Sequence, residues 1–115
     1  MGLNKFKARR VFYDGYWFGS EKERDRYKDL VLLKKAGEIA ELKVHPVYLL
    51  QGAFTYRGRR IRKIEYVADF QYIEDGQIIV EDVKGGKGTQ TQLFKVKVKL
   101  LKKRYPELVF RIVED

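Results

Sequence analysis

Two aspartates and a lysine in the middle of the chain are the residues best suited to act together in a reaction. Asp69 and Asp82 lie in β-prone segments on either side of 74–76, where an Asp-Gly pair predicts a two-residue type I′ hairpin turn. In that register Asp69 is opposite Asp82, and Val67 is opposite Lys84. Because side chains alternate along a strand, Asp69, Asp82 and Lys84 are expected on one face, with the aspartate Cβ atoms about 4.5–5.5 Å apart.

Two carboxylates at this spacing repel each other unless a cation lies between them. A divalent metal supplies that charge, and so does Lys84. Mg²⁺ prefers such oxygen ligands and leaves room for a substrate phosphate, so the pattern predicts phosphodiester hydrolysis, with the lysine orienting water or neutralising phosphoryl charge. The alternative is an ordinary hairpin with an exposed acidic stripe. A three-residue turn would instead place Glu81 opposite Asp69.

A glutamate at the start of the first predicted helix is a further candidate. Ser20 and Glu23 form a capping box, and the helix predicted over residues 20–36 ends at Gly37. Glu23 also shares a helical stripe with Tyr27 that should face the sheet. It can therefore serve as a cap, as a catalytic helper, or as both.

The other elements complete an α/β fold. We expect strands over residues 47–54, 64–73, 77–84 and 108–113, and a second helix that begins with a capping box of Thr89 and Gln92 and ends at Tyr105-Pro106. The order is αβββαβ. A mixed central sheet flanked by a helix on each face is the economical arrangement.

Composition supports one folded domain. The chain has 115 residues, of which 44% are hydrophobic and 14% aromatic, so we expect a domain over residues 11–115 after a flexible basic arm over residues 1–10. The absence of cysteine excludes thiolate metal sites and cysteine nucleophiles. The single histidine, His45, is expected to hydrogen-bond near a strand end and not to bind a metal.

The charge balance points to a polyanionic partner. Twenty-five Lys and Arg against sixteen Asp and Glu leave a net charge of +9, which indicates nucleic acid first and an acidic membrane surface second. The longest apolar run, residues 30–33, is too short to span a bilayer, and residues 1–6 lack a secretory pattern. We therefore expect a soluble, cytoplasmic protein.

Basic residues gather in two places that could hold nucleic-acid phosphates. The tip between the first two predicted strands carries Arg57, Arg59, Arg60, Arg62 and Lys63, and the second helix carries Lys95, Lys97, Lys99, Lys102, Lys103 and Arg104. The alternative for the tip is a strand edge kept charged against aggregation, and for the second helix it is a solvated face. The aromatic cluster Tyr13, Tyr16, Trp17 and Phe18 favours core packing or a dimer contact over base stacking.

These residues resemble the PD-(D/E)XK nuclease superfamily, whose shared core is αβββαβ. Asp69 matches its first acid, Asp82-Val83-Lys84 its (D/E)-x-K element, and Glu23 its first-helix glutamate. Segments 18–23, 35–39, 66–70 and 80–85 look like a phage-associated family within it, and the resemblance covers about residues 11 to 113. Ala68 replaces the proline of the motif and Asp82 stands where Glu is commoner, but neither change removes a ligand.

The resemblance implies a role for each matching residue. Asp69 and Asp82 would bind Mg²⁺, which Mn²⁺ can replace, with the Val83 carbonyl as a further ligand. Glu23 would bind the metal or a water, and Lys84 would be the catalytic lysine. Many relatives place a polar residue of the second helix near the site, and the candidates here are Gln92, Lys95 and Lys97.

The implied activity is metal-dependent endonucleolytic cleavage of DNA by water attack. Small basic members of the superfamily include archaeal Holliday-junction resolvases, which are homodimers, so branched or junction DNA and a homodimer are expected by analogy. The alternative is a non-catalytic DNA-binding or recombination accessory module whose acidic site is vestigial. Cleavage assays with and without a divalent metal separate the two.

Overall fold

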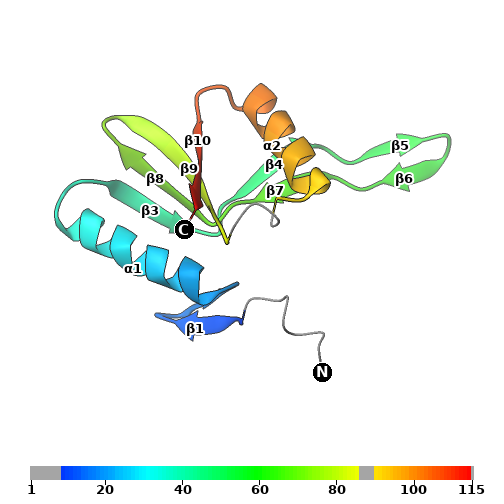
Figure 1. The fold of residues 1–115 in the computed structure, drawn as a ribbon. Coiled ribbons are helices and arrows are strands. Elements are labelled where there is room, and N and C mark those ends of the chain that lie inside the picture. The colour runs from blue at the N-terminus through cyan, green and yellow to red at the C-terminus, as the bar shows by residue number, and fades with distance from the viewer. Residues whose placement is uncertain (1–8, 86–89, 115) are drawn as a thin grey trace.

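The computed structural model describes residues 9–85 and 90–114, which form two helices and ten strands in several small sheets (Figure 1). The elements are β1 (Val11–Tyr13), β2 (Tyr16–Phe18), α1 (Glu21–Lys35), β3 (Ala40–Val44), β4 (Val47–Gln51), β5 (Phe54–Tyr56), β6 (Arg59–Ile61), β7 (Ile64–Val67), β8 (Phe70–Glu74), β9 (Gln77–Lys84), α2 (Gln92–Arg104) and β10 (Val109–Glu114). Most of the predicted N-terminal basic arm, residues 1–8, lies outside the described residues.

The largest sheet has four strands in the order β10-β9-β8-β3 and is mixed. Strands β8 and β9 form the predicted hairpin, with Phe70 opposite Glu81 and Glu74 opposite Gln77. Both turn residues have positive φ, 51° at Asp75 and 76° at Gly76, as a type I′ turn requires. The predicted two-residue turn is therefore confirmed. Strand β10 runs parallel to β9, which the crossover through α2 makes possible.

The segment between α1 and β8 forms one long kinked ribbon. Strand β3 pairs with β8, β4 with β7, and β5 with β6, all antiparallel. The ribbon ends in β5 and β6, here called the projecting hairpin, which extends away from the helices (Figure 1). The ribbon bends at two opposed points, His45-Pro46 on one strand and Ala68-Asp69 on the other, where His45 N–H donates to Asp69 O (2.9 Å) and Ala68 N–H donates to Pro46 O (3.0 Å).

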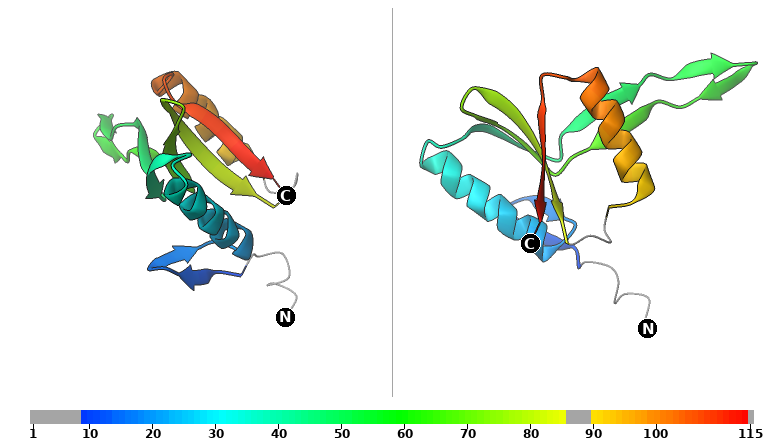
Figure 2. Two further views of the ribbon diagram at one scale, coloured as in Figure 1. Left: turned by 90° about the vertical axis from the view of Figure 1, so that its left-hand side faces the viewer. Right: turned by 45° about the horizontal axis from the view of Figure 1, so that its top comes forward.

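The two helices cover opposite faces of β9, as Figure 2 shows. Alternate residues of β9 divide between two apolar clusters, with Ile79 in the cluster beneath α1 and Val80 in the cluster beneath α2. Leu30 of α1 and Leu101 of α2 are fully enclosed in their respective clusters. A mixed sheet flanked by helices, as predicted, is therefore present at this coarse level.

Helix α1 begins and ends as its sequence predicts. Ser20 is the N-cap, and its Oγ accepts from Glu23 N–H (3.1 Å). At the other end Gly37, with φ 81°, donates to Lys34 O, and Glu38 N–H donates to Leu33 O, which together form a Schellman motif. Lys34 and Lys35 occupy the last turn, where positive charge is favoured by the helix dipole.

Several boundaries differ from the prediction. The predicted strand 64–73 is broken into β7 and β8, so Val67 pairs with Val47 and not with Lys84. The predicted strand 47–54 ends at Gln51, and β1, β2 and β3 were not predicted. The N-cap of α2 is Thr91, whose Oγ1 accepts from Phe94 N–H, whereas the predicted cap, Thr89, lies outside the described residues.

Neither α1 nor α2 is long and apolar enough to cross a membrane, among the residues that the structure describes. The chain therefore shows no spanning helix within residues 9–85 and 90–114.

Candidate metal centre

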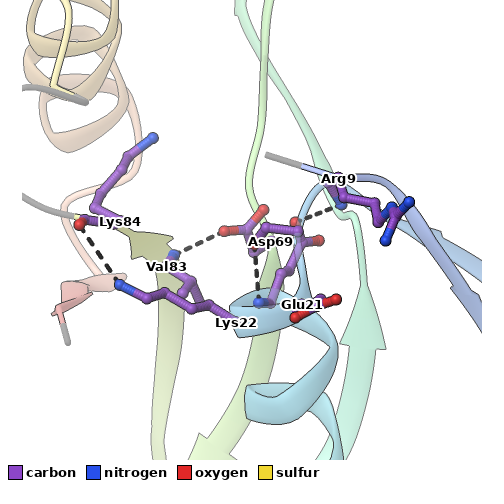
Figure 3. Close-up of a pocket in the computed structure, with 10 residues that line it drawn as sticks. Arg9, Glu21, Lys22, Asp69, Val83 and Lys84 are labelled. Atoms are coloured by element: carbon purple, nitrogen blue, oxygen red, sulfur yellow. Dashed lines mark hydrogen bonds between the residues drawn. The ribbon is translucent and has the colours of Figure 1, made fainter. Parts of the chain in front are cut away.

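An open cavity of about 750 Å³ lies beside the first turn of α1 and the end of β9 (Figure 3). Three of the four predicted catalytic residues line it: Glu23, Asp69 and Lys84. The other lining residues are Arg9, Gly19, Ser20, Glu21, Lys22, Val83 and Gly85. The predicted site residues are thus brought to one place by three separate segments of the chain.

Asp69 lies at the kink of the ribbon, directly beyond the last cross-strand pair of β8 and β9. Strand β9 continues past that pair without β8, and Asp69 supplies hydrogen bonds to this free edge: Oδ2 accepts from Val83 N–H (2.7 Å) and its own N–H donates to Glu81 O (3.2 Å). Burial raises the pKa of Asp69 to about 6, as does the nearby Glu23 charge, against the lowering effects of the Val83 amide, Lys84 and His45.

Asp82 lies next to Asp69 but beneath the cavity, and it is not among the residues that line it. Its Oδ1 accepts from Asp69 N–H (3.0 Å) and its Oδ2 accepts from Tyr66 O–H. The side chain is buried, and burial raises its pKa to about 6 although Lys84 and the Asp69 amide oppose the shift. The predicted proximity of the two aspartates is therefore present, with Asp82 the more enclosed of the two.

Glu23 caps α1, as its position in the sequence predicts, and it also lines the cavity. Its Oε1 accepts from Gly19 N–H (3.0 Å), one residue before the N-cap, so the carboxylate completes the cap of α1. Its Oε2 lies 2.8 Å from His45 Nε2. The glutamate is buried in the first turn of α1, at the N-terminus, where the helix dipole favours negative charge.

His45 is the residue that sequence reasoning missed. The expected hydrogen bond near a strand end is confirmed, to Glu23, but the imidazole also lies close to Asp69, which was not predicted. Ligating atoms of Glu23, His45 and Asp69 all lie within 4.8 Å of one another. The ribbon itself carries part of the signal: counting back along both strands from the Arg57-Gly58 turn places His45 opposite Phe70, and the register shift between Leu49 and Gln51 moves it opposite Asp69.

Lys84 provides positive charge at the edge of this acidic cluster. Its Nζ lies 4.0 Å from the centroid of the Phe94 ring on α2, and Figure 3 shows the side chain directed upwards, towards α2. It nevertheless lowers the pKa of both Asp69 and Asp82 electrostatically. Lys22 also lines the cavity, and its Nζ donates to Gly85 O (3.5 Å).

Glu81 is excluded from the site by its own partners. Because the hairpin turn has two residues, Glu81 faces α1, where Arg26 binds both of its oxygens (2.7 and 2.9 Å) and Tyr72 O–H donates to it (2.6 Å). Its side chain is completely buried. This carboxylate therefore belongs to a closed ion pair that joins α1 to β9.

The donor set at the cavity fits a divalent cation. Glu23, His45 and Asp69 each offer one ligand atom, and two neighbouring carboxyl groups with raised pKa values would be stabilised by added positive charge. Carboxylate oxygens suit Mg²⁺ and Mn²⁺, whereas imidazole favours a transition metal. The role of the Val83 carbonyl as a metal ligand remains a prediction. So does the placing of Gln92, Lys95 or Lys97 of α2 near the site.

The predicted nucleic-acid contacts occupy two exposed surfaces. Arg57, Arg59, Arg60, Arg62 and Lys63 are all exposed on or beside the projecting hairpin, whose turn residues Arg57 and Gly58 have φ 47° and 78°. On α2, Lys95, Lys99, Lys102, Lys103 and Arg104 are exposed and Lys97 is half-buried. Both sets are placed where a polyanion could reach them.

Comparison with known proteins gives one match. A family model described as "Protein of unknown function (DUF1064)" matches residues 3–114. No curated protein and no solved structure gives a significant match.

Proposed function

We propose that this chain, which belongs to the DUF1064 family, is a metal-dependent endonuclease that hydrolyses DNA phosphodiester bonds. The proposal includes a PD-(D/E)XK-type αβββαβ core with Glu23, Asp69, Asp82 and Lys84 as its catalytic residues. The observation that carries it is the convergence of Glu23, His45 and Asp69, whose ligating atoms lie within 4.8 Å of one another beside an open cavity.

A cation held there by the carboxylates would polarise the phosphodiester and lower the pKa of a bound water. Glu23 and His45 hold each other in place through their 2.8 Å contact, and Asp69 is fixed by Val83 N–H, so the ligands are oriented before substrate arrives. Lys84 neutralises negative charge that develops on the phosphoryl oxygens after rotating from its position over the Phe94 ring.

The mixed donor set bears on which metal works best. Mg²⁺ accepts the carboxylates, but imidazole binds transition metals more readily, so Mn²⁺ should support faster cleavage than Mg²⁺. His45→Ala should remove this preference, because it leaves only oxygen ligands.

The projecting hairpin and α2 supply the DNA contacts in this proposal. Their exposed Lys and Arg side chains would neutralise phosphates without contacting base edges. Binding should therefore weaken steeply as the salt concentration rises. Branched or junction DNA is the proposed substrate and a homodimer the proposed assembly, because two cuts at a junction need two active sites.

The test is a cleavage panel of supercoiled, linear and four-way-junction DNA with Mg²⁺, Mn²⁺ or EDTA, alongside a molecular-mass measurement. We expect metal-dependent cleavage that Asp82→Asn and Lys84→Met abolish while DNA binding is retained. Asp25→Asn, an exposed carboxylate paired with Arg24, is the matched control and should cleave normally.

A second function is favoured by one observation. Both Asp82 oxygens accept hydrogen bonds from the protein, from Asp69 N–H and Tyr66 O–H, as expected of a structural acid in a non-catalytic DNA-binding or recombination accessory module. Binding without cleavage in any metal, unchanged in Asp82→Asn and Lys84→Met, would establish that alternative.

A further inference from the structure

The hairpin of β1 and β2 presents different aromatic side chains on its two faces. Tyr13 and Tyr16 face α1, where their rings contact the Tyr27 ring, with centroids 6.2 and 5.7 Å away. Phe12 and Trp17 are a cross-strand pair and point to the opposite face. Their ring centroids are 5.1 Å apart, at an interplanar angle of 56°.

This outer pair is exposed, Phe12 by 57% and Trp17 by 54%. Single exposed apolar residues are ordinary, but two adjacent aromatic rings on one small hairpin form an exposed aromatic patch. Arg10 lies over the Trp17 ring, with its Cζ 5.0 Å from the centroid. The patch is therefore aromatic and cationic together, which is the chemistry that recognises unstacked nucleic-acid bases and their phosphates.

The patch adjoins the candidate metal centre through the chain itself. Trp17 is two residues before Gly19, which lines the cavity, and Arg10 directly follows Arg9, which also lines it. Two residues of extended chain span at most about 7 Å. The main chain that carries Trp17 therefore lies within about 7 Å of a residue that lines the cavity, so a strand whose phosphate lies in the cavity could extend onto this hairpin.

We propose that Phe12 and Trp17, assisted by Arg10, form a stacking platform for an unpaired base next to the phosphate that is cut. This inference rests on the proposed function and defines its substrate more closely: the strand entering the cavity is single-stranded or frayed at that point. A fully paired duplex keeps its bases stacked on each other and offers the platform no free face. Stacking is tolerant of sequence because every base has a π-face.

Trp17 is the only tryptophan in the chain, so its intrinsic fluorescence reports directly on this platform. The experiment titrates the full-length protein, in EDTA so that nothing is cleaved, with an oligothymidylate, a forked duplex and a blunt duplex of equal length. Fluorescence anisotropy of labelled DNA measures binding in parallel. We expect the first two ligands to quench Trp17 and the blunt duplex to leave it unchanged.

Phe12→Ala and Trp17→Ala should each weaken oligothymidylate binding by about ten-fold. Trp17→Phe keeps a stacking ring and should retain affinity within about three-fold. Leu32→Ala, which removes a 64% exposed apolar side chain from α1, is the matched control and should bind like the parent chain. Since Trp17→Phe retains the ring, it distinguishes lost stacking from a disturbed hairpin.

The two proposals fail separately. Quenching and loss of affinity without cleavage in any metal would retain the platform and reject the nuclease. Metal-dependent cleavage with no quenching, or with equal quenching by the blunt duplex, would overturn the platform and leave the nuclease intact. Absence of DNA binding would overturn the platform as well.

Discussion

Replacing Asp69 by Asn should stabilise the metal-free protein at neutral pH while abolishing cleavage. Asn keeps the oxygen that accepts from Val83 N–H but removes a charge from a half-buried position beside Glu23. Carboxylates brought together to bind a metal repel one another, and this repulsion lowers the stability of the metal-free protein. A residue that binds a cation should therefore be one whose neutralisation stabilises the protein.

The magnitude follows from the pKa. Burial and the Glu23 charge raise the pKa of Asp69 from 3.8 to about 6 in the folded protein. A raised carboxyl pKa means that the folded state holds the proton more tightly than the unfolded state. The loss in free energy of unfolding is therefore absent below the pKa of the unfolded state and is complete above the pKa of the folded state. At about pH 8 this carboxylate should lower the free energy of unfolding by about 3 kcal/mol.

Urea unfolding in EDTA measures this directly at about pH 4, 6 and 8. The stability of Asp69→Asn minus that of the parent chain should grow with pH by about 3 kcal/mol in total. Asp25→Asn, at an exposed position, is the control and should show little pH-dependent difference. Adding Mn²⁺ should stabilise the parent chain and not the variant, because only the parent retains the ligand.

A variant that is less stable than the parent at about pH 8, or a difference that does not change with pH, would refute the reasoning. Either result would mean that the Asp69 carboxylate is well solvated or is compensated by Lys84 and His45 more fully than its burial indicates. Unchanged cleavage by the variant would remove Asp69 from the site.

Three further variants test the surroundings of the site. Ser20→Ala removes the N-cap of α1 and should cost about 1 kcal/mol in urea unfolding. Arg26→Met leaves the fully buried Glu81 carboxylate with a lone Tyr partner and should cost about 3 kcal/mol or more by the same measurement. Gly19→Ala places a Cβ 3.1 Å from Glu23 Oε1 and should reduce the cleavage rate about ten-fold or more while the melting temperature changes little; an unchanged rate would show that the Glu23 carboxylate does not need its present position.

Local signals explain the parts of the fold that the sequence predicts well. Helix α1 is defined by Ser20 and Gly37, whose effects act within one turn, and the register of β8 and β9 is set by the Asp75-Gly76 turn between them. Asp69 and Asp82 follow from that register alone. Their proximity was therefore predictable without knowing any other contact.

The missed features depend on contacts between distant segments. Residues 64–73 are mostly β-prone, and the low β-propensity of Ala68 and Asp69 alone does not define a break, which arises because β7 pairs with β4 while β8 pairs with β9 and β3. The three-residue strands β1 and β2 are too short to give a periodic pattern. His45 joins the site only through β3, a strand stabilised by pairing and not by its own composition.

The kinked ribbon separates the length of the projecting hairpin from the geometry of the metal centre. His45 and Asp69 are tied together at the bend, and everything beyond Gln51 and Ile64 lies on the far side of it. Deleting two successive opposed pairs from the outer ribbon preserves both the strand register and the face of each later residue, whereas deleting a residue from one strand alone shifts the register. Insertions and deletions of this kind can thus change how far the projecting hairpin extends without altering the contact between His45 and Asp69.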